Sequence, residues 1–274
     1  MSDSNRSSVR MRITKFGSMA ISRAKTLGFE KEIRALVMGG QGGIGDAIVE
    51  QLAASAQTTQ LYATYRPGKA PPVGGRGAMT QWIPLDVADE SSFVLAAETF
   101  RAANLDFNLV INCTGLLHGD GLDPERSWRH LDIETMTRVF SINTFAVALA
   151  VKHFLPLVNR EERSVFASLS ARVGSIEDNR LGGWYSYRAS KAAQNMILRC
   201  AAIEAKRLRP ALTCVALHPG TVKTTLSAPF TGRPGSRRVF SPEESARYLG
   251  QVIGGLTAED SGGFFGWDGI RIEF

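Results

Sequence analysis

The feature of this chain that most constrains its fold is a cluster of five glycines between positions 39 and 45. A short apolar run, residues 35–38, leads into the cluster, and apolar residues at helical spacing follow it over residues 44–56. A strand that passes through glycines into a helix is the setting in which a dinucleotide pyrophosphate sits on backbone N–H groups. Glycine is needed there because a Cβ would block the turn and the approaching phosphates.

The glycine cluster satisfies two known spacings. The general fingerprint G-x-G-x-x-G begins at position 40, and a wider version is formed by Gly39, Gly43, Ile44 and Gly45. A glycine run alone is weak because an ordinary flexible turn has the same composition. Its position between a strand and a helix favours a dinucleotide-binding turn.

The rest of the chain repeats this alternation of strand and helix. Strand patterns occur at residues 35–38, 61–65, 81–84, 109–112, 165–169 and 213–217. Helical patterns occur at residues 44–56, 91–103, 133–157, 187–207 and 242–253. Such alternation implies βαβ units with right-handed crossovers. We therefore expect an α/β fold: one Rossmann-type, doubly wound domain over residues 30–274, with a mainly parallel sheet flanked by helices on both faces.

Residues 1–29 form a basic N-terminal extension. They carry a net charge of +5 of the chain's +6, so residues 30–274 carry only +1. This distribution argues against a basic nucleic-acid-binding face on the domain, and nucleic-acid binding through the tail would show steep salt dependence. The segment is either a flexible tail, with the protein in the cytoplasm, or a transit segment for a mitochondrion or plastid.

Two other classes of protein are disfavoured by the sequence. No apolar run approaches the roughly 20 residues that span a bilayer, and the longest, residues 142–151, is interrupted by Asn143 and Thr144. We therefore expect no transmembrane segment. Three widely spaced cysteines and four scattered histidines give no disulfide framework and no metal-ligand spacing, so no metal site is expected.

The second strand pattern is followed by Arg66, where an enzyme that binds a ribose 2′-hydroxyl would present an acidic residue. No Asp or Glu occurs between Glu50 and Asp86. An arginine in this position can face the 2′-phosphate of NADP, although a solvated loop arginine before Pro67 is the alternative. The sequence predicts a preference for NADP(H) over NAD(H).

Tyr187 and Lys191 lie four residues apart at the start of a helical pattern, which places both side chains on one helix face. A nearby ammonium group favours phenolate, so we expect Lys191 to lower the pKa of Tyr187. A tyrosine tuned in this way could exchange the proton that accompanies hydride transfer. The spacing is also common by chance on helix surfaces, so it gains weight only from its neighbours.

Those neighbours make residues 34–274 resemble the short-chain dehydrogenase/reductase family. The matching elements occur in the family's order: the glycine turn, Asp86-Val87, Asn112-Cys113-Thr114-Gly115, Asn143, the Tyr187 and Lys191 pair, and Pro219-Gly220-Thr221-Val222-Lys223-Thr224. A narrower likeness to the C-factor and sniffer-type carbonyl reductases lies in Gly174-Ser175-Ile176, in the residues from Gly182 to Arg188, and in Gly262-Gly263-Phe264-Phe265.

The resemblance implies an NADP(H)-dependent oxidoreductase that acts on a small-molecule carbonyl or alcohol, as a homodimer or homotetramer. Tyr187 would be the general acid, Lys191 would bind the nicotinamide ribose, Asn143 would hold a water of the proton relay, and a serine would bond the substrate carbonyl. The positions implied for cofactor binding are Gly39, Gly43, Ile44, Gly45, Arg66, Asp86, Val87, Asn112, Gly115, Lys191, Pro219, Gly220, Val222 and Thr224.

The chain departs from the family's pattern at the serine. The family places its catalytic serine three residues before the glycine that corresponds to Gly174, and here that position is Ala171. We assign the role to the adjacent Ser170, with Ser168 and Ser175 as alternatives. Because successive strand residues point to opposite faces, a shift by one residue matters if the strand continues there.

Ala171 also keeps a second class of function open, a dinucleotide-binding regulatory or signalling protein with weak or no turnover.

Residues 227–240, which contain three arginines, could form a lid over the site. Solvated surface charges are the alternative explanation of those arginines, so we do not infer an acidic substrate from them.

Overall fold

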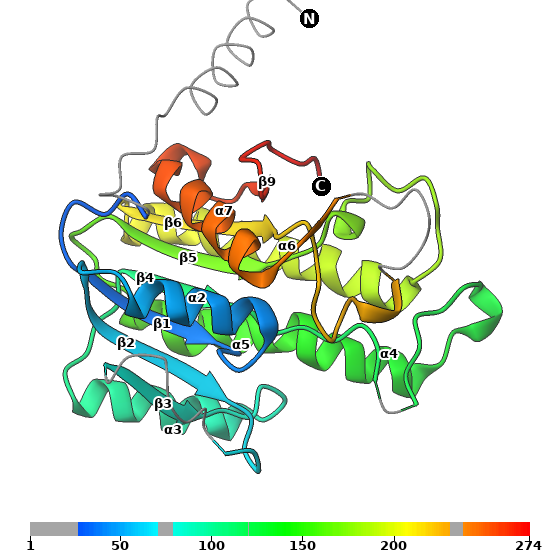
Figure 1. Ribbon diagram of the computed structural model, residues 1–274, viewed down its shortest axis with the longest axis horizontal. Helices are drawn as coiled ribbons and strands as arrows, with labels where there is room; N and C mark the ends of the chain where they lie inside the picture. The colour runs from blue at the N-terminus through cyan, green and yellow to red at the C-terminus, as the bar shows by residue number, and fades with distance from the viewer. Residues whose placement is uncertain (1–26, 71–78, 120, 231–237) are drawn as a thin grey trace, which may run out of the picture.

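The computed structural model describes residues 27–70, 79–119, 121–230 and 238–274. Its main sheet has seven parallel strands in the order β3-β2-β1-β4-β5-β6-β9 (Figure 1). The strands are β1 (Ile33–Met38), β2 (Thr58–Tyr65), β3 (Thr80–Pro84), β4 (Leu109–Asn112), β5 (Ser164–Leu169), β6 (Leu212–His218) and β9 (Phe264–Gly266). Two short strands, β7 (Thr221–Val222) and β8 (Val239–Phe240), form a separate parallel pair.

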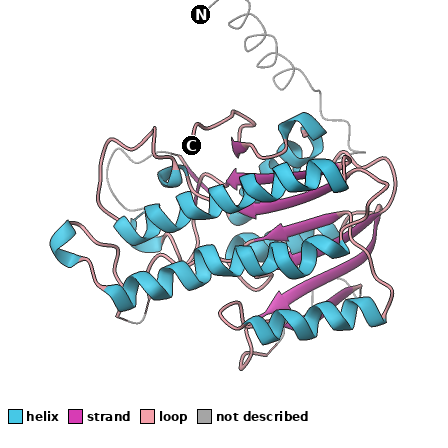
Figure 2. Cartoon of the chain, turned by 180° about the vertical axis from the view of Figure 1, so that it is seen from behind, coloured by secondary structure: helices cyan, strands magenta, loops and turns pink. Residues whose placement is uncertain are grey.

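Helices cover both faces of this sheet. They are α2 (Gly43–Ala53), α3 (Glu90–Ala102), α4 (Ile133–Phe140), α5 (Ala146–Phe154), α6 (Tyr185–Leu208) and α7 (Pro242–Gly255). The apolar residues of α2 and α7 pack on one face of the sheet, and those of α3, α5 and α6 pack on the other. Figure 2 shows long helices lying across one face of the strands. The expected Rossmann-type, doubly wound architecture is confirmed.

The order of the strands reverses direction between β1 and β4, which is the switch point where ligands bind in open parallel sheets. The strand register brings the carboxyl ends together, because Met38 pairs with Asn112 and Asn112 pairs with Ser168. Ser168 in turn pairs with Ala216 of β6. The predicted site residues therefore gather at one edge of the sheet, although they come from distant parts of the sequence.

The segment predicted as one helix over residues 133–157 is continuous but irregular. Its middle, Ser141–Phe145, is a π-helical turn between α4 and α5. By length and composition this stretch, Ile133–Leu157, is apolar enough to cross a membrane, with a mean hydropathy of 1.4. Core helices of globular proteins pass the same test, and here Val147, Ala150 and Phe154 pack beneath the sheet.

Strand β9 was not predicted as a strand from the sequence. It has only three residues, all buried, and pairs with β6 at the edge of the sheet. A run this short shows no alternation of apolar and polar residues, which is why periodicity misses it.

Candidate active site

The glycine turn has the backbone geometry that a pyrophosphate site requires. Gly39 has a φ of +72°, and a Cβ on Gly45 would collide with the carbonyl oxygen of Gly39. A Cβ on Gly43 would come within 2.8 Å of Thr224 on the facing segment. The N-cap of α2 is Gly42, which makes no side-chain capping bond to the first turn. The turn thus keeps a narrow, uncapped helix N-terminus, and these residues fit a bound dinucleotide.

Arg66 lies beside this turn, directly after β2. Its backbone N–H donates to Oε1 of Gln41 at 3.3 Å, and its side chain is exposed. The turn is further tied to β2 by Thr64, whose Oγ1 accepts from the N–H of Gly39 at 3.0 Å. The structure therefore brings Arg66 to the glycine turn, as a role at a 2′-phosphate would need.

The next cofactor candidates lie after β3 and β4. Asp86 is exposed, and its carboxylate accepts from the N–H of Ala88 at 2.9 Å, while Val87 packs against the core. The side chain of Asn112 is buried; its oxygen accepts from the hydroxyl of Thr114 at 2.7 Å. These contacts order the loops at the carboxyl edge of the sheet.

Asn143 sits in the π-helical turn, a distortion that is frequent at functional sites. Its Oδ1 accepts from the N–H of Leu116 at 2.7 Å, and its Nδ2 donates to the carbonyl of Leu116 at 2.9 Å and to Oγ of Ser190 at 3.0 Å. A Cβ built on Gly115 would lie 3.7 Å from Asn143 Oδ1 and 3.8 Å from Lys191 Nζ. Gly115, Asn143 and Lys191 are therefore neighbours.

Tyr187 and Lys191 lie in the first two turns of α6 and are almost fully buried, with exposed fractions of 8% and 2%. The Lys191 ammonium lies 6.0 Å from the centre of the Tyr187 ring. Burial raises the pKa of Tyr187 and lowers the pKa of Lys191 to about 7. The sequence led us to expect a lowered pKa for Tyr187; burial, which disfavours the phenolate, acts in the opposite direction and is the larger effect.

Gln194 is a functional neighbour that the sequence did not reveal. It is fully buried, and its Oε1 accepts from Nζ of Lys191 at 2.9 Å. Its Nε2 donates to Oγ of Ser168 and to the carbonyl of Leu169, both at 3.1 Å. Lys191 also donates to Leu169 at 2.9 Å. The position i+3 from Lys191 was the one available signal, because such residues share a helix face.

All three serines considered for the substrate carbonyl are buried, with their hydroxyls bonded within the protein. Ser170 donates to Oδ1 of Asn195 on α6 at 2.8 Å. Ser168 accepts from Asn112 at 2.9 Å, and Ser175 accepts from the N–H of Asp178 at 3.0 Å. Ser170 can donate its hydroxyl proton to a substrate carbonyl only if it gives up its bond to Asn195.

The segment from Pro219 to Thr224 follows β6 in the chain, and its last residue lies against the glycine turn. Gly220 has a φ of +82°, and a Cβ there would lie 2.6 Å from the ring of Phe240. Pro219 accepts a hydrogen bond from Ser245 at 2.9 Å, and Val222 is buried in β7. These contacts hold the segment against α7 and place Thr224 opposite Gly43.

An aromatic cluster stands beside Tyr187. The ring of Trp184 lies 6.3 Å from that of Tyr187 and 4.9 Å from that of Phe230, and His118 packs on Phe230 at 5.7 Å. Trp184 has a left-handed backbone with a φ of +52°. It is fixed by Glu125, a buried residue whose carbonyl accepts from the N–H of Trp184 and whose carboxylate bonds Ser186 at the start of α6.

Comparison with known proteins agrees with these elements. The family model for short chain dehydrogenases matches residues 34–233. The chain belongs to the short-chain dehydrogenase family.

Among the described residues, no group of His, Cys, Asp or Glu side chains is arranged to hold a metal ion.

Two individual proteins are similar to this chain in sequence. The 1-hydroxy-2-glutathionyl-2-methyl-3-butene dehydrogenase of Rhodococcus sp. is 30% identical over 69% of this chain and 78% of its own length. C-signal of Myxococcus xanthus is 34% identical over 53% of this chain and 81% of its own.

Solved structures extend the comparison. An NADPH-bound carbonyl reductase from chicken fatty liver matches with a TM-score of 0.75 and 29% identity, over 89% of this chain and 100% of its own. Sniffer of D. melanogaster, at 21% identity, shares the fold with the same TM-score and coverage. The expected likeness to C-factor and sniffer-type reductases is confirmed.

Proposed function

We propose that this chain is an NADP(H)-dependent oxidoreductase that reduces an aldehyde or ketone to an alcohol, or carries out the reverse reaction. The observation that carries this proposal is the buried arrangement of Tyr187, Lys191 and Asn143 at the carboxyl edge of the sheet, next to a glycine turn that fits a dinucleotide. Membership of the dehydrogenase family supports the reaction class.

In this proposal, the cofactor supplies the hydride. The residues of the chain bind the cofactor, orient the substrate and protonate its carbonyl oxygen. Tyr187 carries its phenolic proton at neutral pH, and burial, which raises its pKa, keeps it in that form. Its phenol can therefore serve as the proton donor to the carbonyl oxygen of a substrate. Lys191 is held by Gln194 and Leu169, which fixes its ammonium near the tyrosine ring. Asn143 fixes the backbone of Leu116, the residue that follows Gly115, through two hydrogen bonds.

The preference for NADP(H) rests on Arg66. The backbone N–H of Arg66 is bonded to Gln41 of the glycine turn. The side chain of Arg66 therefore begins next to the turn, where a 2′-phosphate would lie. Structures similar to this chain contain NADPH in the chicken carbonyl reductase and NADP in two proteins from Burkholderia. These neighbours support the proposed cofactor.

The proposed substrate is an aldehyde or ketone with an apolar body near the carbonyl. The aromatic cluster of Trp184, Tyr187 and Phe230 supplies a wall for such a group. The chicken relative is a carbonyl reductase, and the Rhodococcus relative is named for an alcohol substrate. We assign the carbonyl hydrogen bond to Ser170, which requires its hydroxyl to turn from Asn195 toward the substrate.

A second candidate function is a dinucleotide-binding regulator with weak turnover. Ala171 at the family's serine position favours it, and the Myxococcus relative carries the name C-signal. The buried Tyr187 and Lys191 favour catalysis instead.

The deciding experiment measures initial rates of NADPH and NADH oxidation with a panel of aldehydes, ketones and quinones, for the wild type and for Tyr187→Phe. NADPH-dependent turnover that is lost in the variant is expected. Folded protein that binds NADPH but reduces none of the compounds would favour the regulator.

The oligomeric state and the cellular location stay predictions. Residues 1–26 of the basic extension lie outside the described residues.

A further inference from the structure

Glu125 is a buried carboxylate to which the proposed function gives no role. It lies in the loop between β4 and α4, and only 3% of its surface is exposed. Its two oxygens accept from the N–H of Ser186 at 3.3 and 3.2 Å, and one of them also accepts from the Ser186 hydroxyl. None of the ion pairs among the described residues includes Glu125. Burying a carboxylate without a counter-charge is unfavourable, so its bonds to Ser186 have to offset that cost.

Glu125 supplies the cap that the start of α6 lacks. The N-cap residue of this helix is Trp184, whose side chain makes no capping hydrogen bond. Helices usually begin with Ser, Thr, Asp or Asn, whose side-chain oxygen accepts from the first turn. Here the carboxylate of Glu125, 61 positions before Ser186, accepts from the first turn instead. Its negative charge also lies at the positive end of the helix dipole. The cap comes from a distant loop because a tryptophan occupies the N-cap position.

The backbone at Trp184 is left-handed, which is a strained conformation for a tryptophan. Its φ is +52°, and the two residues before it, Gly182 and Gly183, have φ values of +62° and +65°. Glycine adopts such angles freely, whereas a residue with a Cβ does not. Two hydrogen bonds hold Trp184 in place: its N–H donates to the carbonyl of Glu125, and its carbonyl accepts from the N–H of Arg188 at 2.8 Å. Strained backbone of this kind persists only where the surrounding structure fixes it, and it is concentrated at functional sites.

The ring of Trp184 belongs to a series of four aromatic rings that ends at Tyr187. The series runs from His118 to Phe230 to Trp184 to Tyr187, with separations of 5.7, 4.9 and 6.3 Å between ring centres. His118 also donates through Nε2 to the carbonyl of Thr225 at 2.9 Å. The series therefore joins the loop after β4 and the segment after β7 to the start of α6, beside the proposed proton donor.

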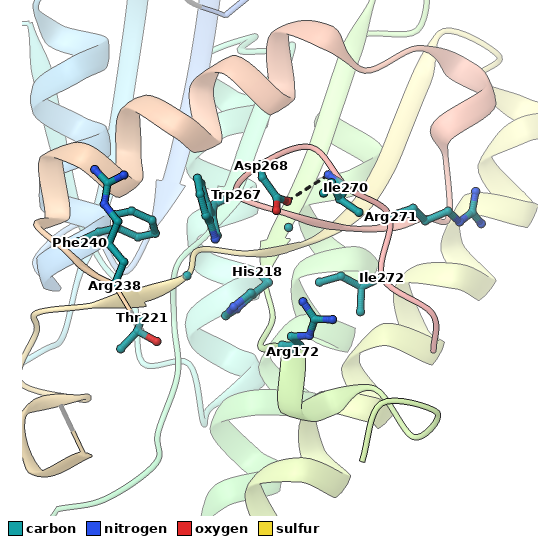
Figure 3. Close-up of a pocket in the computed structure, with 12 residues that line it drawn as sticks. Arg172, His218, Thr221, Arg238, Phe240, Trp267, Asp268, Ile270, Arg271 and Ile272 are labelled. Atoms are coloured by element: carbon teal, nitrogen blue, oxygen red, sulfur yellow. Dashed lines mark hydrogen bonds between the residues drawn. The ribbon is translucent and has the colours of Figure 1, made fainter. Parts of the chain in front are cut away.

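A cavity of about 390 Å³ at the carboxyl end of β6 lies apart from this series (Figure 3). Its lining includes His218 and Trp267, and none of the described residues that line it is Tyr187, Lys191 or Trp184. The four rings therefore form a surface of their own beside Tyr187.

We propose that Glu125 is a positioning residue that holds the Trp184 ring beside Tyr187, and that through this ring it sets a preference for carbonyl compounds with an aromatic group on the carbonyl carbon. Such a group can pack against the Trp184 ring while the carbonyl oxygen meets the phenol of Tyr187. A small aliphatic group has no ring to make this contact. The inference rests on the proposed function, because it names the substrate class of the same site.

The first test measures kcat/KM for benzaldehyde and for propanal with saturating NADPH, and follows the ratio of the two through a set of variants. Glu125→Ala should lower this ratio about tenfold, the size of one aromatic contact, mainly through a higher KM for benzaldehyde. Glu125→Gln keeps an oxygen that accepts from Ser186 and should hold the ratio within about twofold of the wild type. Asp123→Asn changes an exposed acid of the same loop and is the matched control. An unchanged ratio in Glu125→Ala, even with an equal loss of activity toward both aldehydes, would overturn the proposal.

A double-mutant cycle shows whether Glu125 acts through Trp184. Trp184→Ala should lower the same ratio about tenfold, and the addition of Glu125→Ala should lower it no further. A second full loss in the double variant would contradict the assignment, because Glu125 would then act by another route. If Glu125→Ala does not fold, Ser186→Ala takes its place in the cycle, since it removes one of the donors to the carboxylate.

A binding measurement separates this proposal from the proposed function. Calorimetry on the NADPH-bound protein uses benzamide and propionamide, unreactive neutral analogues of the two aldehydes, and needs no turnover. Benzamide should bind about tenfold more weakly to Glu125→Ala than to the wild type, and propionamide should bind equally to both. Weaker benzamide binding by a variant of a protein that reduces neither aldehyde would support the role of Glu125 while the proposed function fails for these compounds. Equal binding of benzamide to both proteins, or none to the wild type, would overturn the role of Glu125.

Discussion

The ammonium group of Lys191 donates a hydrogen bond of 2.9 Å to the side-chain oxygen of Gln194, one turn further along α6. The amide of Gln194 is oriented by two bonds to the end of β5, at Ser168 and Leu169, so its oxygen faces the lysine. Through this contact the sheet fixes the position of the ammonium group. We regard Gln194 as a positioning residue for Lys191.

Gln194→Leu removes the acceptor that stabilises the charged form of Lys191, so the pKa of Lys191 should fall further. We expect kcat for carbonyl reduction to fall about tenfold, the effect of one lost charged hydrogen bond. The alkaline limb of the kcat/KM profile should move down by about one pH unit. Gln194→Glu keeps an acceptor and should move that limb to higher pH. A lower kcat with an unchanged pH profile would show that Gln194 has only a structural role.

The buried Lys191 should make stability depend on pH. Its pKa is about 7 in the folded protein and 10.5 in the absence of burial, so the unfolded chain binds more protons between these values. Stability should therefore rise with pH over this window, by up to about 4 kcal/mol between pH 7 and 10. Above about pH 10 the raised pKa of Tyr187 reverses the trend, because the unfolded chain then loses its phenolic proton first.

Urea denaturation of the wild type and Lys191→Met at pH 7, 8.5 and 10 measures this dependence. The difference between the two proteins cancels the contributions of other groups. Parallel curves would show that Lys191 is not the source of the rise.

Arg66→Ala should raise the KM for NADPH by about 30-fold, since one charged contact to a phosphate is worth about 2 kcal/mol. The KM for NADH should change by no more than about twofold, because NADH lacks the 2′-phosphate. Lys69→Ala removes an exposed cation three residues further on and serves as the control. Equal losses for both cofactors would remove the assignment of Arg66.

The role of Ser170 is tested against its partner on α6. Ser170→Ala and Asn195→Ala each break the bond between these buried side chains, and each should lower the free energy of unfolding by about 1–2 kcal/mol. If Ser170 bonds the substrate carbonyl, its variant should lose at least about tenfold more kcat than the asparagine variant does. Equal kcat values in the two variants would move the role elsewhere.

Much of the fold and part of the site followed from local patterns in the sequence. The glycine turn, the helix that starts near Tyr187 and the position of Arg66 after β2 are properties of short segments. The positive φ of a glycine and the period of a helix each depend on only a few neighbouring residues. The sequence is therefore enough to predict them. The alternation of strand and helix led to the expectation of a parallel, doubly wound sheet, which the observed strand order confirms.

Tertiary structure decided what depends on residues that are distant in the sequence. The contact of Gln194 with Ser168 and the buried bond of Ser170 to Asn195 each join separate elements. The direction of the pKa shift of Tyr187 also depends on burial, which the spacing to Lys191 does not encode. Desolvation and side-chain orientation are set by packing of the whole domain, so they emerge only when the strands and helices are assembled.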